Sequence, residues 1–161
     1  MQNLKTLFKR PLQAVPSSLV ITILVIALIG FVDAGYLTME HYQGVIPPCT
    51  IVSGCEKVLT SSYSIVLGVP VSLLGVIFYA IVAAGTFAYL EGKHEKIFRF
   101  SLIVALVGIV ASLWFLFVQA FLLQSYCLYC LGSAVTSTIL FVLACVVFKK
   151  YGDKTYSSQT A

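Results

Sequence analysis

A run of 49 consecutive residues, 100–148, contains no charged side chain. A single helix of that length would extend roughly 73 Å, whereas the hydrocarbon core of a bilayer is only about 30 Å thick. The run must therefore fold back on itself. Its polar interruption, residues 124–126, lies just before Cys127. This pattern predicts two membrane spans, with Cys127 and Cys130 at a membrane surface on the first turn of the second one.

The whole chain has the composition of a membrane protein. Of its 161 residues, 60% are hydrophobic and 10% are charged, whereas a soluble domain has a charged fraction of ~25%. We therefore expect an all-α integral membrane protein, a four-transmembrane-helix bundle that forms a single membrane domain over residues 1–161. Its hydropathy predicts four spans, at about residues 18–40, 70–90, 98–123 and 126–148.

The net charge of +4 follows from membrane topology. Nine of the ten basic residues precede the first span, separate the second from the third, or follow the fourth; Lys57 is the exception. Basic flanks favour the cytoplasmic side, so both termini are predicted to be cytoplasmic. Residues 41–69 then form an extracytoplasmic loop. We expect a multi-pass protein of the cell (inner) membrane, in contact with lipid and not with nucleic acid, with its active site on the periplasmic or extracellular face.

The predicted outer loop carries one pair of cysteines, Cys49 and Cys55. Residues 53–56, Ser-Gly-Cys-Glu, have the S-x-x-E spacing of a capping box. This spacing predicts a short helix over about residues 54–61, with Ser53 as its N-cap and Cys55 in its first turn. The helix dipole would favour the thiolate form of Cys55.

The second pair, Cys127 and Cys130, is predicted to lie at the same membrane face as the loop pair. Each pair has one member at a helix start, an arrangement that favours thiol–disulfide exchange, in which a thiolate attacks a nearby disulfide. Two alternatives stay open. The loop disulfide could be an inert clip in a structural tetraspan protein, or all four sulfurs could hold a metal ion. No metal is expected, because two of the four ligands would lie at the edge of the hydrocarbon.

Cys130 is predicted to lie one turn deeper than Cys127 and to face the interior of the bundle. A quinone, a lipid-soluble two-electron acceptor, partitions into this region and requires an apolar pocket with a few polar groups. The candidate lining residues are aromatic side chains of the second and third spans and two loop hydroxyls: Phe78, Tyr79, Trp114, Phe115, Ser61 and Ser62.

Two other candidate residues, Asp33 and Cys145, belong to neither cysteine pair. Asp33 lies about 22 Å along the first span, in its outer third. An acid in a span usually has a partner or a function, so Asp33 is predicted either to hydrogen-bond a neighbouring helix or to handle protons near a redox site. Cys145 lies about 22 Å along the helix from Cys130 and cannot join that pair. It is predicted to be a small buried hydrophobic residue.

These motifs resemble the vitamin K epoxide reductase (VKOR) family and its bacterial quinone-linked relatives, over about residues 18–148. The resemblance is carried by Cys49 and Cys55 and by three segments: GCEKVLTS at 54–61, GVPVSLLGVIFY at 68–79 and CLYC at 127–130. It implies a four-helix bundle around a quinone.

The resemblance also implies a role for each cysteine. Cys49 would exchange with a reduced thioredoxin-like partner, Cys55 would pass electrons to Cys127, and Cys130 would reduce the quinone. The implied protein is a quinone-dependent protein-disulfide oxidoreductase that supports disulfide bond formation.

By the same resemblance, Ser61, Phe78 and Leu74 would bind the quinone, which would be of the ubiquinone, menaquinone or phylloquinone type. Animal members of the family carry an asparagine where this chain has Val71, and a tyrosine where it has Ala134. The chain is more similar to bacterial and plant members, many of which continue into a thioredoxin-like domain. Because this sequence ends at Ala161, its thioredoxin-like partner is expected to be a separate extracytoplasmic protein.

Overall fold

The computed structural model describes residues 15–49, 54–92 and 94–151. Within them, four helices are long and apolar enough to cross a membrane. These helices are α2 (Ser17–Gln43), α4 (Val71–Gly92), α5 (Glu95–Phe117) with its π-helical extension η2 (Val118–Leu122), and α6 (Leu128–Tyr151). The predicted fold class, an all-α membrane protein with four transmembrane helices, is confirmed.

Three of the four long helices, α2, α4 and α6, end slightly beyond their predicted spans. For example, α2 ends at Gln43 and α6 at Tyr151, against predicted ends near residues 40 and 148. Backbone hydrogen bonding continues through the polar residues that follow each apolar run. The helix therefore ends later than the apolar run from which the span was predicted. α2 stops where Gly44 adopts φ 68°, a left-handed conformation that commonly ends helices.

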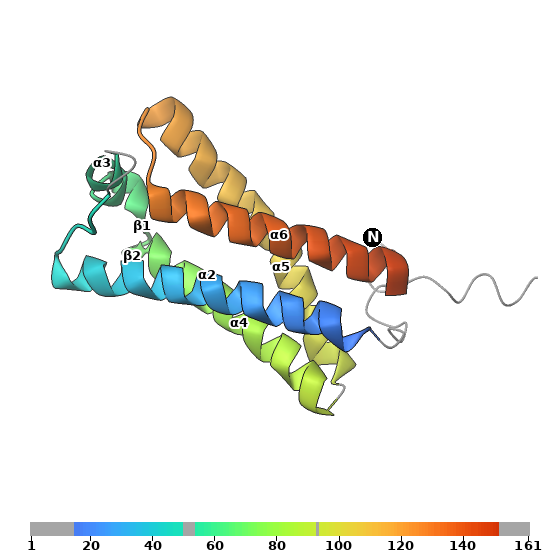
Figure 1. The fold of residues 1–161 in the computed structure, drawn as a ribbon. Helices are drawn as coiled ribbons and strands as arrows, with labels where there is room; N and C mark the ends of the chain where they lie inside the picture. Colours follow the sequence, from blue (N-terminus) through green and yellow to red (C-terminus); the bar gives the residue numbers. More distant parts are fainter. Residues whose placement is uncertain (1–14, 50–53, 93, 152–161) are drawn as a thin grey trace, which may run out of the picture.

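The four long helices pack as a ring, in which α2 contacts α4 and α6, and α5 contacts α4 and α6 (Figure 1). Small residues let the helices approach closely. Gly30 of α2 lies against the ring of Tyr79, Gly85 of α4 against Ser101, and Gly108 of α5 against Phe78. These contacts fix the positions of Phe78 and Tyr79 between the helices.

One end of the bundle carries all the short elements, namely α3 (Cys55–Leu59), η1 (Ser62–Ser64), β1 (Ile65–Val66) and β2 (Val69–Pro70). Figure 1 shows them beside the end of α2 and the start of α6. We call this end the cysteine end. β1 and β2 form an antiparallel hairpin in which Ile65 faces Pro70 and Val66 faces Val69. Its two turn residues both have positive φ, as tight hairpin turns require.

The predicted loop helix exists, but its boundaries differ from the prediction. α3 begins at Cys55, with Gly54 at the N-cap position, and ends at Leu59. The prediction of Ser53 as N-cap was therefore wrong, and Ser53 itself lies outside the described residues. Cys55 does lie in the first turn.

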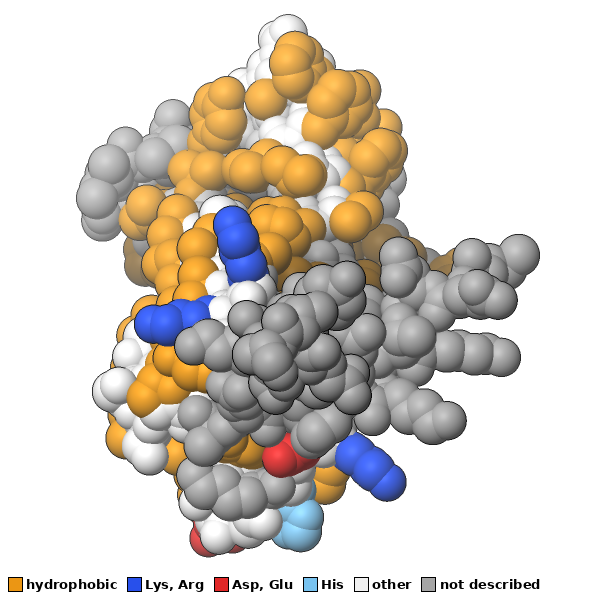
Figure 2. Space-filling view, turned by 90° about the vertical axis from the view of Figure 1, so that its right-hand side faces the viewer, with side chains coloured by type: hydrophobic (Ala, Val, Ile, Leu, Met, Phe, Trp, Pro, Cys, Tyr) orange, Lys and Arg blue, Asp and Glu red, His pale blue; other side chains and the backbone are white. Residues whose placement is uncertain are grey.

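The opposite end of the bundle carries basic side chains. α5 begins there with Lys96 and Arg99, and α6 ends there with Lys149 and Lys150. Figure 2 faces this end and shows Lys and Arg side chains on it, with hydrophobic side chains on the flanks. Of the basic residues in the described ranges, Lys57 is the one placed at the cysteine end.

Candidate redox site and adjoining cavity

Four cysteines from distant parts of the sequence meet at the cysteine end. Cys55 and Cys127 are 1% and 0% exposed and belong to one apolar cluster, against which Cys49 and Cys130 pack. Cys49 and Cys55 form a disulfide, whereas Cys127 and Cys130 are free thiols. A disulfide packed against a dithiol is the arrangement that thiol–disulfide exchange requires.

Gly54 brings the two pairs together. A Cβ atom added to Gly54 would lie 2.6 Å from the carbonyl oxygen of Tyr126 and 2.8 Å from its nitrogen. Because both neighbours are backbone atoms, a residue with a side chain cannot approach as closely. The start of α3 therefore lies directly on the backbone that precedes Cys127. In a second link, the Tyr129 hydroxyl donates a 3.4 Å hydrogen bond to the carbonyl oxygen of Pro48.

Cys127 immediately precedes the spanning helix α6, and its carbonyl accepts a hydrogen bond from Leu131. Its sulfur accepts a hydrogen bond from the Cys130 thiol and further bonds from the backbone N–H groups of Tyr129 and Cys130. These donors hold the pKa of Cys127 below its usual range, at about 7, although burial opposes them. Cys127 is thus the sulfur prepared to act as a thiolate.

This arrangement predicts the titration of Cys127. The hydrogen bond from Cys130 stabilises the thiolate, so Cys130→Ala should raise the pKa of Cys127 and leave less thiolate at neutral pH. Ultraviolet thiolate absorbance against pH, in reduced protein whose Cys49 and Cys55 are both replaced by alanine, measures this shift. The same protein with Cys127→Ser provides the baseline. An identical titration with and without Cys130 would contradict the assigned hydrogen bond.

Gln119 supports Cys127 and was missed in the sequence. Its Oε1 atom accepts a 2.8 Å hydrogen bond from the backbone N–H of Cys127, and the residue is only 2% exposed. Gln119 lies in η2, and π-helical turns are rare and often occur at functional sites. The available signal was an uncharged polar side chain in an apolar span, close in sequence to a cysteine pair.

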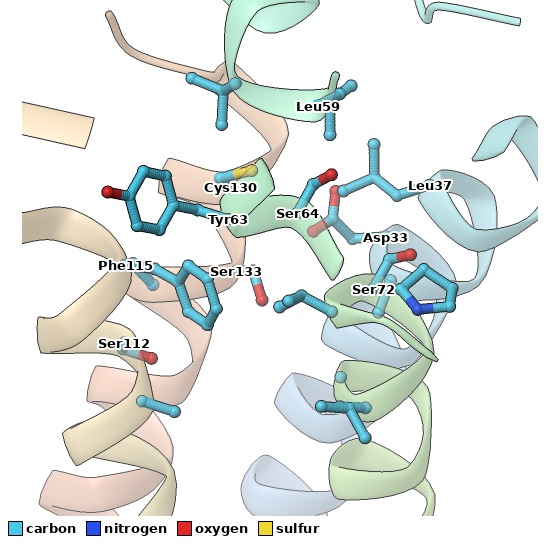
Figure 3. Close-up of a pocket in the computed structure, with 18 of the residues that line it drawn as sticks. Asp33, Leu37, Leu59, Tyr63, Ser64, Ser72, Ser112, Phe115, Cys130 and Ser133 are labelled. Atoms are coloured by element: carbon cyan, nitrogen blue, oxygen red, sulfur yellow. The ribbon is translucent and has the colours of Figure 1, made fainter. Parts of the chain in front are cut away.

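A cavity of about 880 Å³ adjoins Cys130, and of the four clustered sulfurs only that of Cys130 lines it. The volume lies within the range of roughly 300–1,000 Å³ that is typical of small-molecule sites. The wall is mostly apolar, and Figure 3 shows several of the polar side chains that interrupt it. The polar side chains that line the cavity include Asp33, Ser61, Ser64, Ser72, Ser112, Gln119, Ser133 and Ser137.

The three predicted quinone-binding residues, Ser61, Phe78 and Leu74, all line this cavity. The Ser61 hydroxyl donates a 2.7 Å hydrogen bond to the carbonyl of Val58. The ring of Phe78 packs edge-on against that of Tyr79, with centroids 4.9 Å apart. The structure thus gathers the three residues near Cys130, while their role in binding a quinone stays a prediction.

Two orientations were predicted wrongly. Trp114 is 54% exposed and is not part of the cavity wall, because Ala111, Ser112 and Phe115 present the inner face of α5. Cys145 is exposed and not buried, because its neighbours Ala144 and Val147 present the inner face of α6. Tyr79 and Phe115 do line the cavity, as predicted, whereas Ser62 is exposed and is not part of its wall.

Asp33 also lines the cavity, and its Oδ2 atom is buried without a hydrogen-bond partner. This oxygen does not make the predicted hydrogen bond to a neighbouring helix. In the described ranges 15–49, 54–92 and 94–151, no three His, Cys, Asp or Glu side chains are placed to hold a metal ion. The disulfide also withdraws Cys49 and Cys55 from thiolate ligation.

Fold and site together define a class: a four-helix membrane protein with a disulfide, a dithiol and an apolar cavity at one end. The sequence model of the vitamin K epoxide reductase family matches residues 21–145. The chain therefore belongs to the vitamin K epoxide reductase family. It is also 35% identical over 122 residues to the thiol-disulfide oxidoreductase LTO1 of Arabidopsis thaliana. That match covers 70% of this chain but 32% of the plant protein, so the chain spans about a third of that relative's length.

Proposed function

We propose that the protein is a membrane thiol oxidoreductase that passes electrons from a reduced thioredoxin-like partner to a membrane quinone and so supports disulfide bond formation. The observation that carries this proposal is the meeting of both cysteine pairs at one end of the bundle, with Cys130 on the wall of an apolar cavity. Family membership and the similarity to a plant thiol-disulfide oxidoreductase support thiol–disulfide chemistry.

The difference in burial between the loop cysteines supports the order of exchange that we propose. Cys49 is partly exposed, whereas Cys55 is buried against Cys127. A thiolate of the partner therefore attacks Cys49, and Cys55 leaves as a thiolate. The partner's second thiol then displaces Cys49, which releases the partner in its disulfide form.

The reduced loop pair next transfers its electrons inward. The Cys55 thiolate attacks Cys127 of an oxidised Cys127–Cys130 pair, and Cys130 is released on the wall of the cavity. Cys49 then attacks Cys55, which restores the loop disulfide and leaves both Cys127 and Cys130 reduced. Two electrons have moved from the loop to the edge of the cavity.

The residues around the cavity fit a quinone. A bound quinone would supply a two-electron acceptor, of the ubiquinone, menaquinone or phylloquinone type. Phe78 and Leu74 offer apolar contacts, and the hydroxyl of Ser61 lies on the same wall. Val71 and Ala134 also line the cavity, so the two positions that differ from the animal enzymes both face this space.

The proposed site lies at the periplasmic or extracellular face of the cell (inner) membrane, on a single membrane domain over residues 1–161. Two observations support this placement. The described basic residues, apart from Lys57, lie at the other end of the bundle, and basic ends favour the cytoplasm. A Cys49–Cys55 disulfide also suits an oxidising compartment. The proposed partner is a thioredoxin-like protein on that face.

The experiment combines purified protein, reduced thioredoxin as the model partner and, in separate assays, a soluble short-chain analogue of each of the three quinone types, and follows the absorbance of the quinone. The wild type should turn over continuously. Cys49→Ser should oxidise no thioredoxin, even in the first turnover, because the disulfide that the partner attacks is missing. Its Cys127–Cys130 pair, reduced directly with dithiothreitol, should still reduce the quinone.

Cys145→Ser is the matched control, because Cys145 is exposed and far from the cluster; it should retain full activity. Continued oxidation of thioredoxin by Cys49→Ser would overturn the assigned order of exchange. A wild-type protein that reduces none of the three quinone types would overturn the proposed function and would favour a purely structural loop disulfide.

A further inference from the structure

Asp33 lies on α2, which packs beside α6, the helix that carries Cys130, and its side chain lines the cavity. It belongs to a face of α2 that runs through Leu37, Glu40 and His41 toward the cysteine end, and all four residues line the cavity. Figure 3 shows the Asp33 carboxyl group near Ser64, at the same level of the cavity as the Cys130 sulfur.

The hydrogen bonding of Asp33 is incomplete. Its Oδ2 atom is buried and has no partner, although buried polar atoms are nearly always paired. A carboxyl group in this state is least costly when it is neutral, or when a ligand provides the missing partner. Acidic residues inside a span are costly and are usually functional.

The neighbouring hydroxyls do not provide that partner. The Tyr79 hydroxyl lies 2.9 Å from the Ser133 carbonyl and 2.7 Å from the Thr136 hydroxyl, so it is engaged with α6. The Ser64 hydroxyl donates to the carbonyl of Ser61 at 2.7 Å. The unpaired oxygen of Asp33 is therefore available to a molecule in the cavity.

We propose that Asp33 donates a proton to a carbonyl oxygen of the quinone while the Cys127–Cys130 pair is oxidised. This inference rests on the proposed function and deepens it.

The proton balance requires such a donor. When Cys127 is a thiolate, the reduced pair holds a single thiol proton, that of Cys130. Formation of the Cys127–Cys130 bond breaks the S–H bond of Cys130 and releases two electrons and one proton. Reduction of a quinone to a quinol consumes two electrons and two protons, so the second proton must come from elsewhere. Asp33 supplies it and regains a proton from extracytoplasmic water along the α2 face that ends at Glu40 and His41.

The test compares Asp33→Asn, Asp33→Glu and the control Glu91→Gln, which makes the same carboxyl-to-amide change on the exposed far end of α4. Quinone reduction is started from protein reduced with dithiothreitol, which bypasses the partner. Asp33→Asn should lower kcat by about 10²-fold, within the range that general acid catalysis contributes. Its KM should change little, because the amide still donates a hydrogen bond. Asp33→Glu should recover part of the rate, and Glu91→Gln should match the wild type.

Infrared difference spectra on addition of a short-chain ubiquinone give a readout that does not depend on turnover. A carboxylic-acid band should shift in the wild type and in Glu91→Gln, and the shift should be absent in Asp33→Asn. If Asp33→Asn does not fold, Asp33→Ser, which is smaller and also lacks an acid, should show the same two losses.

The outcomes separate this inference from the proposed function. If wild-type protein reduces quinone and Asp33→Asn has the same kcat, Asp33 is not the donor and the proposed function stands. An increase in KM at unchanged kcat would make Asp33 a binding residue only and would also overturn the inference. If the wild type does not reduce quinone at all, the proposed function fails first.

Discussion

Cys130→Ser should abolish continuous quinone reduction, with a loss on the order of 10³-fold or more, as for other nucleophile deletions. Cys130 is the sulfur of the cluster that lines the cavity, and a serine hydroxyl cannot form a disulfide with Cys127. The loop disulfide should remain reducible, so each molecule should oxidise one thioredoxin and then stop. Quinone absorbance and the stoichiometry of oxidised thioredoxin measure the two halves of this result.

Cys130→Ser keeps a hydrogen-bond donor of nearly the same size at this position, so the protein is expected to fold. Cys145→Ser, on the same helix, controls for removal of a thiol from α6. Sustained turnover by Cys130→Ser would mean that another sulfur, or another route, delivers electrons to the quinone.

Gly54→Ala should slow electron transfer between the two pairs by about 10²-fold, the cost of a misplacement of roughly 1 Å in a reacting geometry. The backbone of Gly54 has φ −101° and ψ −2°, which alanine can adopt, so the effect is steric. The added Cβ would collide with backbone atoms of Tyr126, and α3 must move away from Cys127. Thioredoxin-driven quinone reduction should fall, while reduction driven by dithiothreitol through Cys127 and Cys130 should be unaffected.

Gly35→Ala is the matched control, because a Cβ at Gly35 meets no atom within 4 Å. It should leave both rates unchanged. If Gly54→Ala transferred electrons between the pairs at the wild-type rate, the close contact at Tyr126 would have no role in the exchange.

The sequence predicts the fold well because the bilayer imposes a strong length constraint. A 49-residue run without charged side chains has to turn back within a membrane, and its polar interruption marks the position of the turn. The break comes at residues 123–127, between η2 and α6, and places Cys127 at a helix start. The two cysteine pairs could be assigned to the same membrane face by the same reasoning.

The rotation of each span about its axis could not be predicted, and this explains the errors at Trp114 and Cys145. In a soluble helix the apolar stripe identifies the buried face. In a membrane, lipid is as apolar as the protein interior, so the buried face is set by close packing instead. Small residues such as Gly108 and Ala144 face inward here, while Trp114, although large and apolar, is 54% exposed on the outer face of α5.

The contacts that build the site are also tertiary. The hydrogen bond from Cys127 to Gln119 depends on a π-helical turn, and the position of Gly54 depends on the backbone of Tyr126. Neither follows from local sequence, and the capping-box spacing at Ser53 and Glu56 predicted a different helix start. The unpaired oxygen of Asp33 is likewise visible only when the surrounding helices are in place.

The central claim is that electrons cross directly from Cys55 to Cys127. The double variant Cys49→Ser, Cys130→Ser leaves these two thiols without their own partners, and mild oxidation followed by peptide mass spectrometry identifies the bond they form. We expect an intramolecular Cys55–Cys127 disulfide as the main product. Protein in which both cysteines stay reduced, or form only intermolecular disulfides, would contradict the account.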